Sequence, residues 1–250
     1  AGRYVEPPLA ADLGTSAPAD GHQSSKAMQY SLGLSALLYE GLTVTLAGYY
    51  HVTKHLPVVT DPTVFTSVSR NSFSPLVLEI VQQYLGEGTP RGSLGRGKAY
   101  GLETLLTYER GAQRLQVAYT WSRSKRTEDP ALYEGFHPYV LDQPHRLHAV
   151  WQYATPRWIW GAGFHFATGI PYSPVTLSED GVFTQDLWGR RVPNFMQLDL
   201  RAERRWRRAG GDWGVYLEIQ NATARTNVES VRDAVRSADD PANATLTTTK

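Results

Sequence analysis

Runs of about ten residues, in which apolar and polar side chains alternate, recur along the chain. Strict alternation predicts a β-strand with one apolar and one polar face, because successive side chains of a strand point to opposite sides. The pattern predicts about eight strands, over residues 26–38, 42–51, 98–109, 115–124, 145–153, 158–168, 195–206 and 213–221. Very short turns near Glu40, Gly111, Thr155 and Gly210 join these strands in pairs, and longer loops join each pair to the next.

A regular alternation of short turns and long loops is typical of an up-and-down antiparallel barrel that crosses a membrane. About ten residues is also the length that a tilted strand needs to cross a bilayer. We therefore predict an all-β fold, an antiparallel transmembrane β-barrel segment of about eight up-and-down strands. The alternative, a soluble β-sandwich, would not order its loops in this way. In such a barrel the short turns lie on the periplasmic side and the long loops outside.

Aromatic residues flank the short turns, where amphipathic rings suit the headgroup level of a bilayer. They are Tyr39, Tyr108, Tyr153, Trp158, Trp206 and Trp213. The alternation predicts a lipid-facing side that includes Leu102, Val117, Trp151, Phe164, Leu198 and Leu217. It predicts an interior side that includes Glu103, His148, Asp199 and Glu218.

Three parts are expected along the chain. Residues 1–25, rich in Ala, Pro, Gly and Asp, are predicted to form an extracellular loop. Residues 26–221 are predicted to form the barrel segment with long outer loops, and residues 222–250 a polar loop or tail. The stretch LVLEIVQQY, which starts at Leu76, is predicted to form a short helix or an extra strand.

Composition narrows the functional classes. The mean hydropathy is −0.38, and no apolar run approaches the roughly 18 residues of a membrane helix. A net charge of +1 gives no sign of nucleic-acid binding, and the absence of cysteine excludes disulfides and thiolate metal sites. The chain contains neither G-x-S-x-G nor H-E-x-x-H, so we expect no enzyme and no cofactor.

Polar residues of the expected inner face are candidates for ligand contact. Six charged residues form an inner wall that could contact a polar ligand, or could simply pair across strands; they are Glu103, Asp199, Arg201, Glu203, Arg205 and Glu218. His148 and His165 lie on neighbouring expected strands and could be a metal pair or two polar residues of a wet lumen. We favour the second reading and predict no metal site.

Aromatic residues of the expected outer loops are further candidates. They are Tyr133, Phe136, Tyr139, Tyr172 and Phe183. Loops on a rigid scaffold often carry recognition, so these rings could stack on a sugar or a siderophore, or could pack the loops together. The predicted ligand-binding set is Glu103, His148, His165, Asp199, Arg201, Glu218, Tyr133 and Tyr172.

Six segments, taken in order, resemble the C-terminal barrel portion of TonB-dependent outer-membrane receptors. They are GKAYGLETLL, TWSRS, LDQPHRLHAVWQY, GAGFHFATGIPYSPV, VPNFMQLDLRAERRW and VYLEIQN. The resemblance implies a plugged barrel of about 22 strands and energised import of a scarce ligand, without catalysis. It implies the outer membrane of a Gram-negative bacterium as location. The implied partners are outer-membrane lipid, a TonB-type energy-transducing complex that acts through a plug, and further segments or chains that complete the barrel.

The sequence departs from the family pattern in ways that predict a partial barrel. We find no plug domain, no N-terminal TonB box and no terminal aromatic residue in it, and the last residues, 247–250, are polar. We therefore predict that this chain belongs to a larger barrel and does not close one alone. Two alternatives are a structural or scaffolding barrel subunit of a larger surface complex, and a small closed barrel that acts as an adhesin or enzyme. The small closed barrel requires Gln29–Ser31 to pair with Val215–Ile219.

Overall fold

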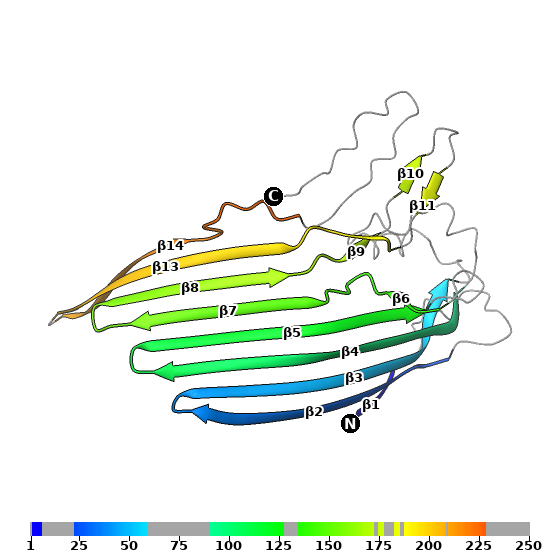
Figure 1. Cartoon of the computed structure of the whole chain (residues 1–250), viewed down its shortest axis with the longest axis horizontal. Coiled ribbons are helices and arrows are strands. Elements are labelled where there is room, and N and C mark those ends of the chain that lie inside the picture. Colours follow the sequence, from blue (N-terminus) through cyan, green and yellow to red (C-terminus); the bar gives the residue numbers. More distant parts are fainter. Residues whose placement is uncertain are drawn as a thin grey trace.

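The computed structural model describes residues 2–6, 23–59, 91–127, 135–172, 175–177, 183–185, 188–208 and 210–228. All the regular elements in these ranges are β-strands (Figure 1). Within the same ranges, no helix has the length and apolar character needed to span a membrane.

Eight long strands form one antiparallel sheet, in the order in which they follow along the chain. They are β2 (Ser25–Tyr39), β3 (Leu42–Val59), β4 (Arg91–Arg110), β5 (Gln113–Thr127), β7 (His145–Ala154), β8 (Trp158–Ala167), β13 (Phe195–Arg208) and β14 (Gly211–Ile219). Tight turns join them in pairs at the four predicted places. The predicted fold class, strands and turns are confirmed.

Six short strands accompany the main sheet. β1 (Gly2–Glu6) pairs with the start of β2, and β6 (His137–Pro138) pairs with the end of β5. Two small ribbons lie at the loop end of the sheet (Figure 1): β9 (Pro171–Tyr172) pairs with β12 (Arg190–Arg191), and β10 (Val175–Leu177) pairs with β11 (Phe183–Gln185).

Two details differ from the sequence prediction. The stretch predicted as a loop over residues 1–25 contains β1. Its Tyr4 and Val5 favour a strand, but the Pro- and Ala-rich residues around them led to the prediction of a loop. β3 and β4 also run beyond the predicted ends, through two register shifts. Backbone pairing there needs no apolar face, so the alternation that predicts strands is lost. The stretch that starts at Leu76 lies outside the described residues.

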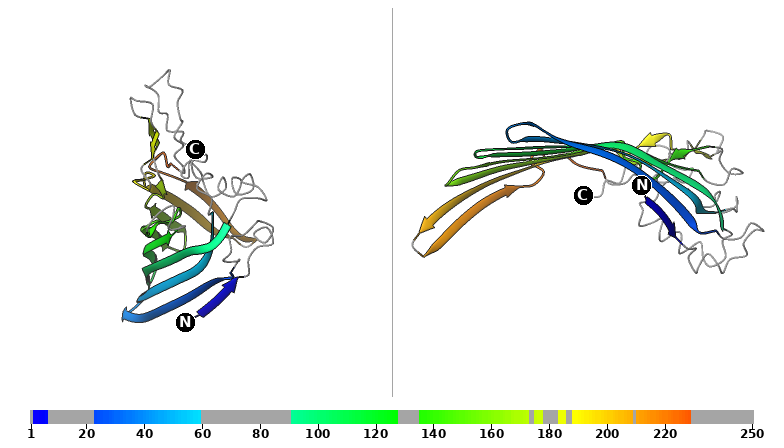
Figure 2. Two further views of the ribbon diagram at one scale, coloured as in Figure 1. Left: turned by 90° about the vertical axis from the view of Figure 1, so that its right-hand side faces the viewer. Right: turned by 90° about the horizontal axis from the view of Figure 1, so that it is seen from below.

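The sheet arches along its length and remains open (Figure 2). β1 lies at one edge and β14 at the other, and the described residues contain no pairing between β14 and either β1 or β2. Gln29 pairs with Gly2 instead of with β14. The prediction that the described chain does not close a barrel by itself is confirmed, and the pairing required by a small closed barrel is not found.

The cross-strand register divides the side chains into two faces. Residues directly opposite each other on neighbouring strands share a face; for example, Leu46 on β3 lies between Leu34 on β2 and Thr104 on β4. Followed across all eight strands, the register places every residue predicted to face lipid on one side, and Glu103, His148, Asp199 and Glu218 on the other. Large side chains of the apolar face are exposed, Leu32 to 83% and Leu217 to 66%. A face of this kind needs an apolar solvent.

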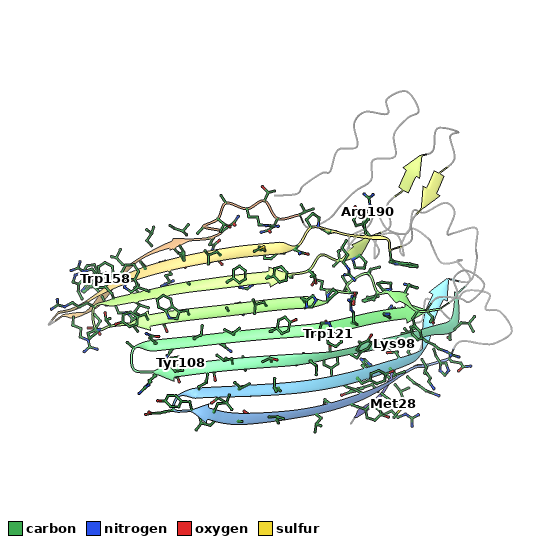
Figure 3. All side chains as sticks on the ribbon, in the orientation of Figure 1. Met28, Lys98, Tyr108, Trp121, Trp158 and Arg190 are labelled. Atoms are coloured by element: carbon green, nitrogen blue, oxygen red, sulfur yellow. The ribbon has the colours of Figure 1, made fainter. Side chains whose placement is uncertain are left out.

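Aromatic rings bracket the apolar face at both ends of the strands. At the turn end, Trp158 stacks on Trp160 with ring centroids 5.4 Å apart. Toward the loop end, Tyr100 lies 6.3 Å from Tyr50 and 6.0 Å from Trp121. Figure 3 shows Tyr108 and Trp158 near the turns and Trp121 farther toward the loops. Tyr100 and Tyr108 are eight residues apart, which is about 27 Å along the strand. If the strand is tilted by about 40° from the membrane normal, this corresponds to about 20 Å of membrane thickness. That height suits a bilayer's apolar layer.

Candidate functional site

A charged network occupies the polar face of the sheet near its β14 edge. Arg201 donates hydrogen bonds to Glu218 at 3.2 Å and to Glu203 at 3.0 Å, and Arg205 donates to Glu203 at 2.7 Å. Residues two apart on a strand share a face, which is why 201, 203 and 205 meet. The Arg201 guanidinium also lies over the Tyr216 ring, 4.1 Å from its centroid. Much of the charge is therefore paired within the wall.

Asp199 serves as an acceptor where β14 ends. Its carboxylate accepts two hydrogen bonds from Gln197 Nε2, at 2.9 and 3.0 Å, and one from the backbone N–H of Asn221 at 2.8 Å. The bond from Asn221 ties the chain to β13 as it leaves β14, while Gln197 orients the carboxylate from within β13. Asp199 therefore has a structural task in addition to its place on the inner wall.

Two of the hollows that the described residues line lie on the polar face. One, of about 440 Å³, lies over Gly161 and Gly163, which are directly opposite Arg201 and Asp199 and lack side chains to fill the space. The other, of about 650 Å³, is lined on the β3–β5 side by Thr43, Thr107 and Glu109. Together they make the charged face concave, and charged residues of both signs are among those that line them, which suits a polar ligand or another protein segment.

His148 and His165 lie directly opposite each other beside this network. Their ring centroids are 4.1 Å apart with the planes tilted by 49°. The described part of the chain has no group of three or more His, Cys, Asp or Glu placed to hold a metal ion. His145 lies on the apolar face, where its Nδ1 is 2.8 Å from the Tyr119 hydroxyl, so it does not join the pair.

The structure brings together five of the eight predicted ligand-binding residues. Asp199, Arg201 and Glu218 lie in or beside the charged network, with His148 and His165 next to them. Glu103 shares the face but lies on β4, opposite Ala47 and Thr120. Tyr172 lies on β9, opposite Arg190 at the loop end, and Tyr133 is outside the described residues.

A buried ion pair at the loop end was not predicted. The Asp142 side chain is only 2% exposed, and its carboxylate accepts from Arg191 and, at 2.6 Å, from the backbone N–H of Ser124. Arg123 lies 3.6 Å from the same carboxylate. Arg191 also donates to the backbone oxygens of Asp142 and Gly169, at 2.6 and 3.0 Å.

This Asp142 cluster joins β5, the segment before β7, the segment after β8 and β12. Gly169 is required there, because a Cβ at this position would overlap the carbonyl of Val192. The sequence pointed to Asp142 only through the LDQPHR segment, which is part of the family resemblance. No comparable segment pointed to its partner Arg191.

An arched antiparallel sheet with one apolar face, bracketed by aromatic rings, and one charged face is the wall of a transmembrane β-barrel. The chain matches the family model described as TonB dependent receptor-like, beta-barrel, over residues 1–222, and it belongs to this family. No curated protein matches it.

Solved structures share the fold at low identity. The chain is similar to the ferric-catecholate import receptor Fiu of E. coli, with 14% identity, a TM-score of 0.60, and coverage of 92% of this chain and 29% of that one. It is similar to the FrpB iron transporter of Neisseria meningitidis, with 16% identity, a TM-score of 0.54, and coverage of 85% and 29%. It is similar to the ferripyoverdine receptor of Pseudomonas aeruginosa, with 11% identity, a TM-score of 0.55, and coverage of 84% of this chain and 25% of that one. The chain thus spans less than a third of the length of these receptors.

Proposed function

We propose that this chain is part of the barrel wall of an outer-membrane receptor of a Gram-negative bacterium, which binds a scarce ligand and imports it with TonB-supplied energy. The observation that carries the proposal is the division of one continuous sheet into a lipid-compatible face and a charged, hollowed face. Further wall segments complete the barrel, since open sheet edges do not persist in lipid.

The receptor takes part in binding and passage, and its wall residues perform no chemistry on the ligand. Outer loops held by the Asp142 cluster capture the ligand, with Tyr133 and Tyr172 as candidate aromatic contacts. The interior face, with Glu103, His148, His165, Asp199, Arg201 and Glu218, borders its path and the movable plug. TonB acts through the plug.

A ferric chelate is the ligand class that we propose. The similar receptors named above are described as ferric-catecholate, iron and ferripyoverdine receptors. Their low identity carries the fold alone, so the support from this chain itself is a polar wall of mixed charge that suits a large, hydrophilic and charged cargo.

Deletion of the gene in its own bacterium should abolish uptake of at least one ⁵⁵Fe-labelled catecholate or hydroxamate chelate from a panel. The reason is that the other receptors of the cell would not have the same interior surface for that chelate. Re-expression of the complete receptor should restore uptake. A protonophore, which removes the energy source, should block uptake but leave binding of the chelate at the surface.

Two results would decide against this function. Unchanged uptake of every chelate in the deletion strain would exclude the proposed ligand class. Loss of other surface proteins from the outer membrane, with normal uptake, would favour the scaffolding alternative.

A further inference from the structure

The apolar face carries a group of cations beyond its ring of aromatic residues at the loop end. The register places them together on β1 to β5; they are Arg3, Lys26, Lys54, Arg96, Lys98 and Lys125, here called the basic patch. Figure 3 shows Lys98 at the loop end of the strands, far from Tyr108 and Trp158. The described strands place no Asp or Glu on this face.

Cations within the basic patch lie directly opposite one another. Lys26 faces Lys54, and Lys54 in turn faces Arg96. Lys98 faces Lys125 one row closer to the middle of the sheet. Side chains in such positions start about 5 Å apart, and like charges there destabilise a sheet. An anion between them removes that cost.

The protein supplies little compensation of its own. In the part of the chain that the structure describes, none of the six residues is in an ion pair with a carboxylate. Among the described residues, Lys98 is the one member of the patch with an aromatic contact, its Nζ lying 4.1 Å from the Phe136 ring centroid. Arg3, Lys26, Lys54 and Arg96 are exposed.

Cations at the turn end of the same face are different. Arg110 lies 3.9 Å from Glu40 and over the Tyr39 ring, and Arg204 lies over the rings of Trp158 and Trp206, 5.1 and 5.3 Å from their centroids. These arginines have partners within the protein. The contrast indicates that the basic patch is built for a partner outside it.

The height of the basic patch identifies that partner. Lys98 and Arg96 follow Tyr100 outward by two and four residues, about 7 and 13 Å along the strand. Tyrosine rings mark the headgroup level, so the cations lie among or just above the lipid headgroups. β3 and β4 remain paired farther out, at Leu56 with Gly95 and Val58 with Gly92, so the patch lies on paired strands and not on a loop.

We propose that the basic patch binds the phosphate groups of an anionic lipid in the outer leaflet, so that a phosphorylated glycolipid is held against the outside of β1–β5. Lysine and arginine recognise phosphate through charge-assisted hydrogen bonds, and each basic residue at a membrane surface adds to the attraction. The patch faces away from the lumen, which favours a lipid over a soluble phosphate. The inference rests on the placement of the apolar face in lipid and is independent of the ligand that the receptor imports.

The test uses the complete receptor, purified in detergent micelles, and bisphosphorylated lipid A as the probe. Native mass spectrometry counts the bound lipid over a titration. Replacement of four patch residues, K26Q, K54Q, R96Q and K98Q, should weaken binding by at least about tenfold. Added salt should weaken binding to the unaltered receptor, because the attraction is electrostatic.

Matched controls separate the basic patch from general charge and from folding. Four substitutions at the turn end, R110Q and R204Q on the same face and R114Q and R207Q on the polar face, remove equal charge and should change binding less than about twofold. The charge-retaining variant with K26R, K54R and K98R should bind as the unaltered receptor does. Heat-modifiable migration on gels verifies that each variant has folded.

Three results would overturn the proposal. They are equal loss in the patch and turn-end variants, equal binding of dephosphorylated lipid A, and competition by inorganic phosphate at concentrations similar to those of the lipid. Uptake plays no part in these measurements, so failure here leaves the proposed function untouched.

Discussion

An arginine at Leu46 should destabilise the folded receptor by about 2–4 kcal/mol, whereas an arginine at the next residue, Ala47, should cost less than about 1 kcal/mol. Leu46 lies on the apolar face, four residues from Tyr50 and four from Leu42 at the turn, and so near the middle of the membrane. Ala47 lies on the polar face directly opposite Glu103, where a new guanidinium finds water and a carboxylate.

The two free energies come from urea titrations of the complete receptor folded into lipid vesicles. The substitutions are adjacent and introduce the same side chain, so propensity and backbone effects are matched. Equal penalties, or a larger one at Ala47, would mean that the faces are reversed or that the sheet does not lie in a membrane.

Removal of the Asp142 carboxylate by an alanine substitution should lower the free energy of unfolding by about 3 kcal/mol and loosen the outer loops. The side chain is buried, and its loss leaves Arg191, Arg123 and the Ser124 N–H without their shared acceptor. Limited proteolysis of the receptor in intact outer membranes measures the loosening, since the loop end should be cut first.

Glu109 provides the matched control for Asp142. It also pairs with an arginine, at 2.6 Å from Arg114, but both side chains are well exposed, 65% and 70%. An alanine at Glu109 should therefore cost less than about 1 kcal/mol and leave the cleavage rate unchanged. Similar effects of the two substitutions would show that burial does not give the Asp142 cluster its importance.

The strands and their faces were predictable because a membrane strand must keep strict alternation over its whole crossing. Leu102 and Glu103, adjacent in sequence, point to a lipid-compatible and a polar side for this reason. The extensions of β3 and β4 and the presence of β1 were not predictable. The extensions lie beyond the part of the strands that must alternate to cross a membrane, and depend on backbone pairing there. β1 is a single short strand, and the Pro- and Ala-rich residues around it obscure its pattern.

Individual contacts at the site were less predictable than the site's location. Alternation places Arg201, Glu203 and Arg205 on one face, and that placement was foreseen. The Asp142 cluster depends on Arg191, which is 49 residues away. No local pattern connects two residues at such a distance, and only the return of the chain after β8 brings them together. The basic patch was missed for a similar reason, since its members come from four separate hairpin arms and β1.

Site-directed spin labelling of β4 tests the central claim most directly, and this chain has no cysteine of its own to compete for the label. Single cysteines at positions 102 to 107 of the complete receptor in vesicles would carry a nitroxide, whose collisions with oxygen and with a water-soluble nickel chelate are compared. At Leu102, Thr104 and Leu106 collisions with oxygen should dominate, and at Glu103, Leu105 and Thr107 collisions with the nickel chelate should become more frequent. A signal without a two-residue period, or one with the opposite phase, would contradict a barrel wall with this apolar face in lipid.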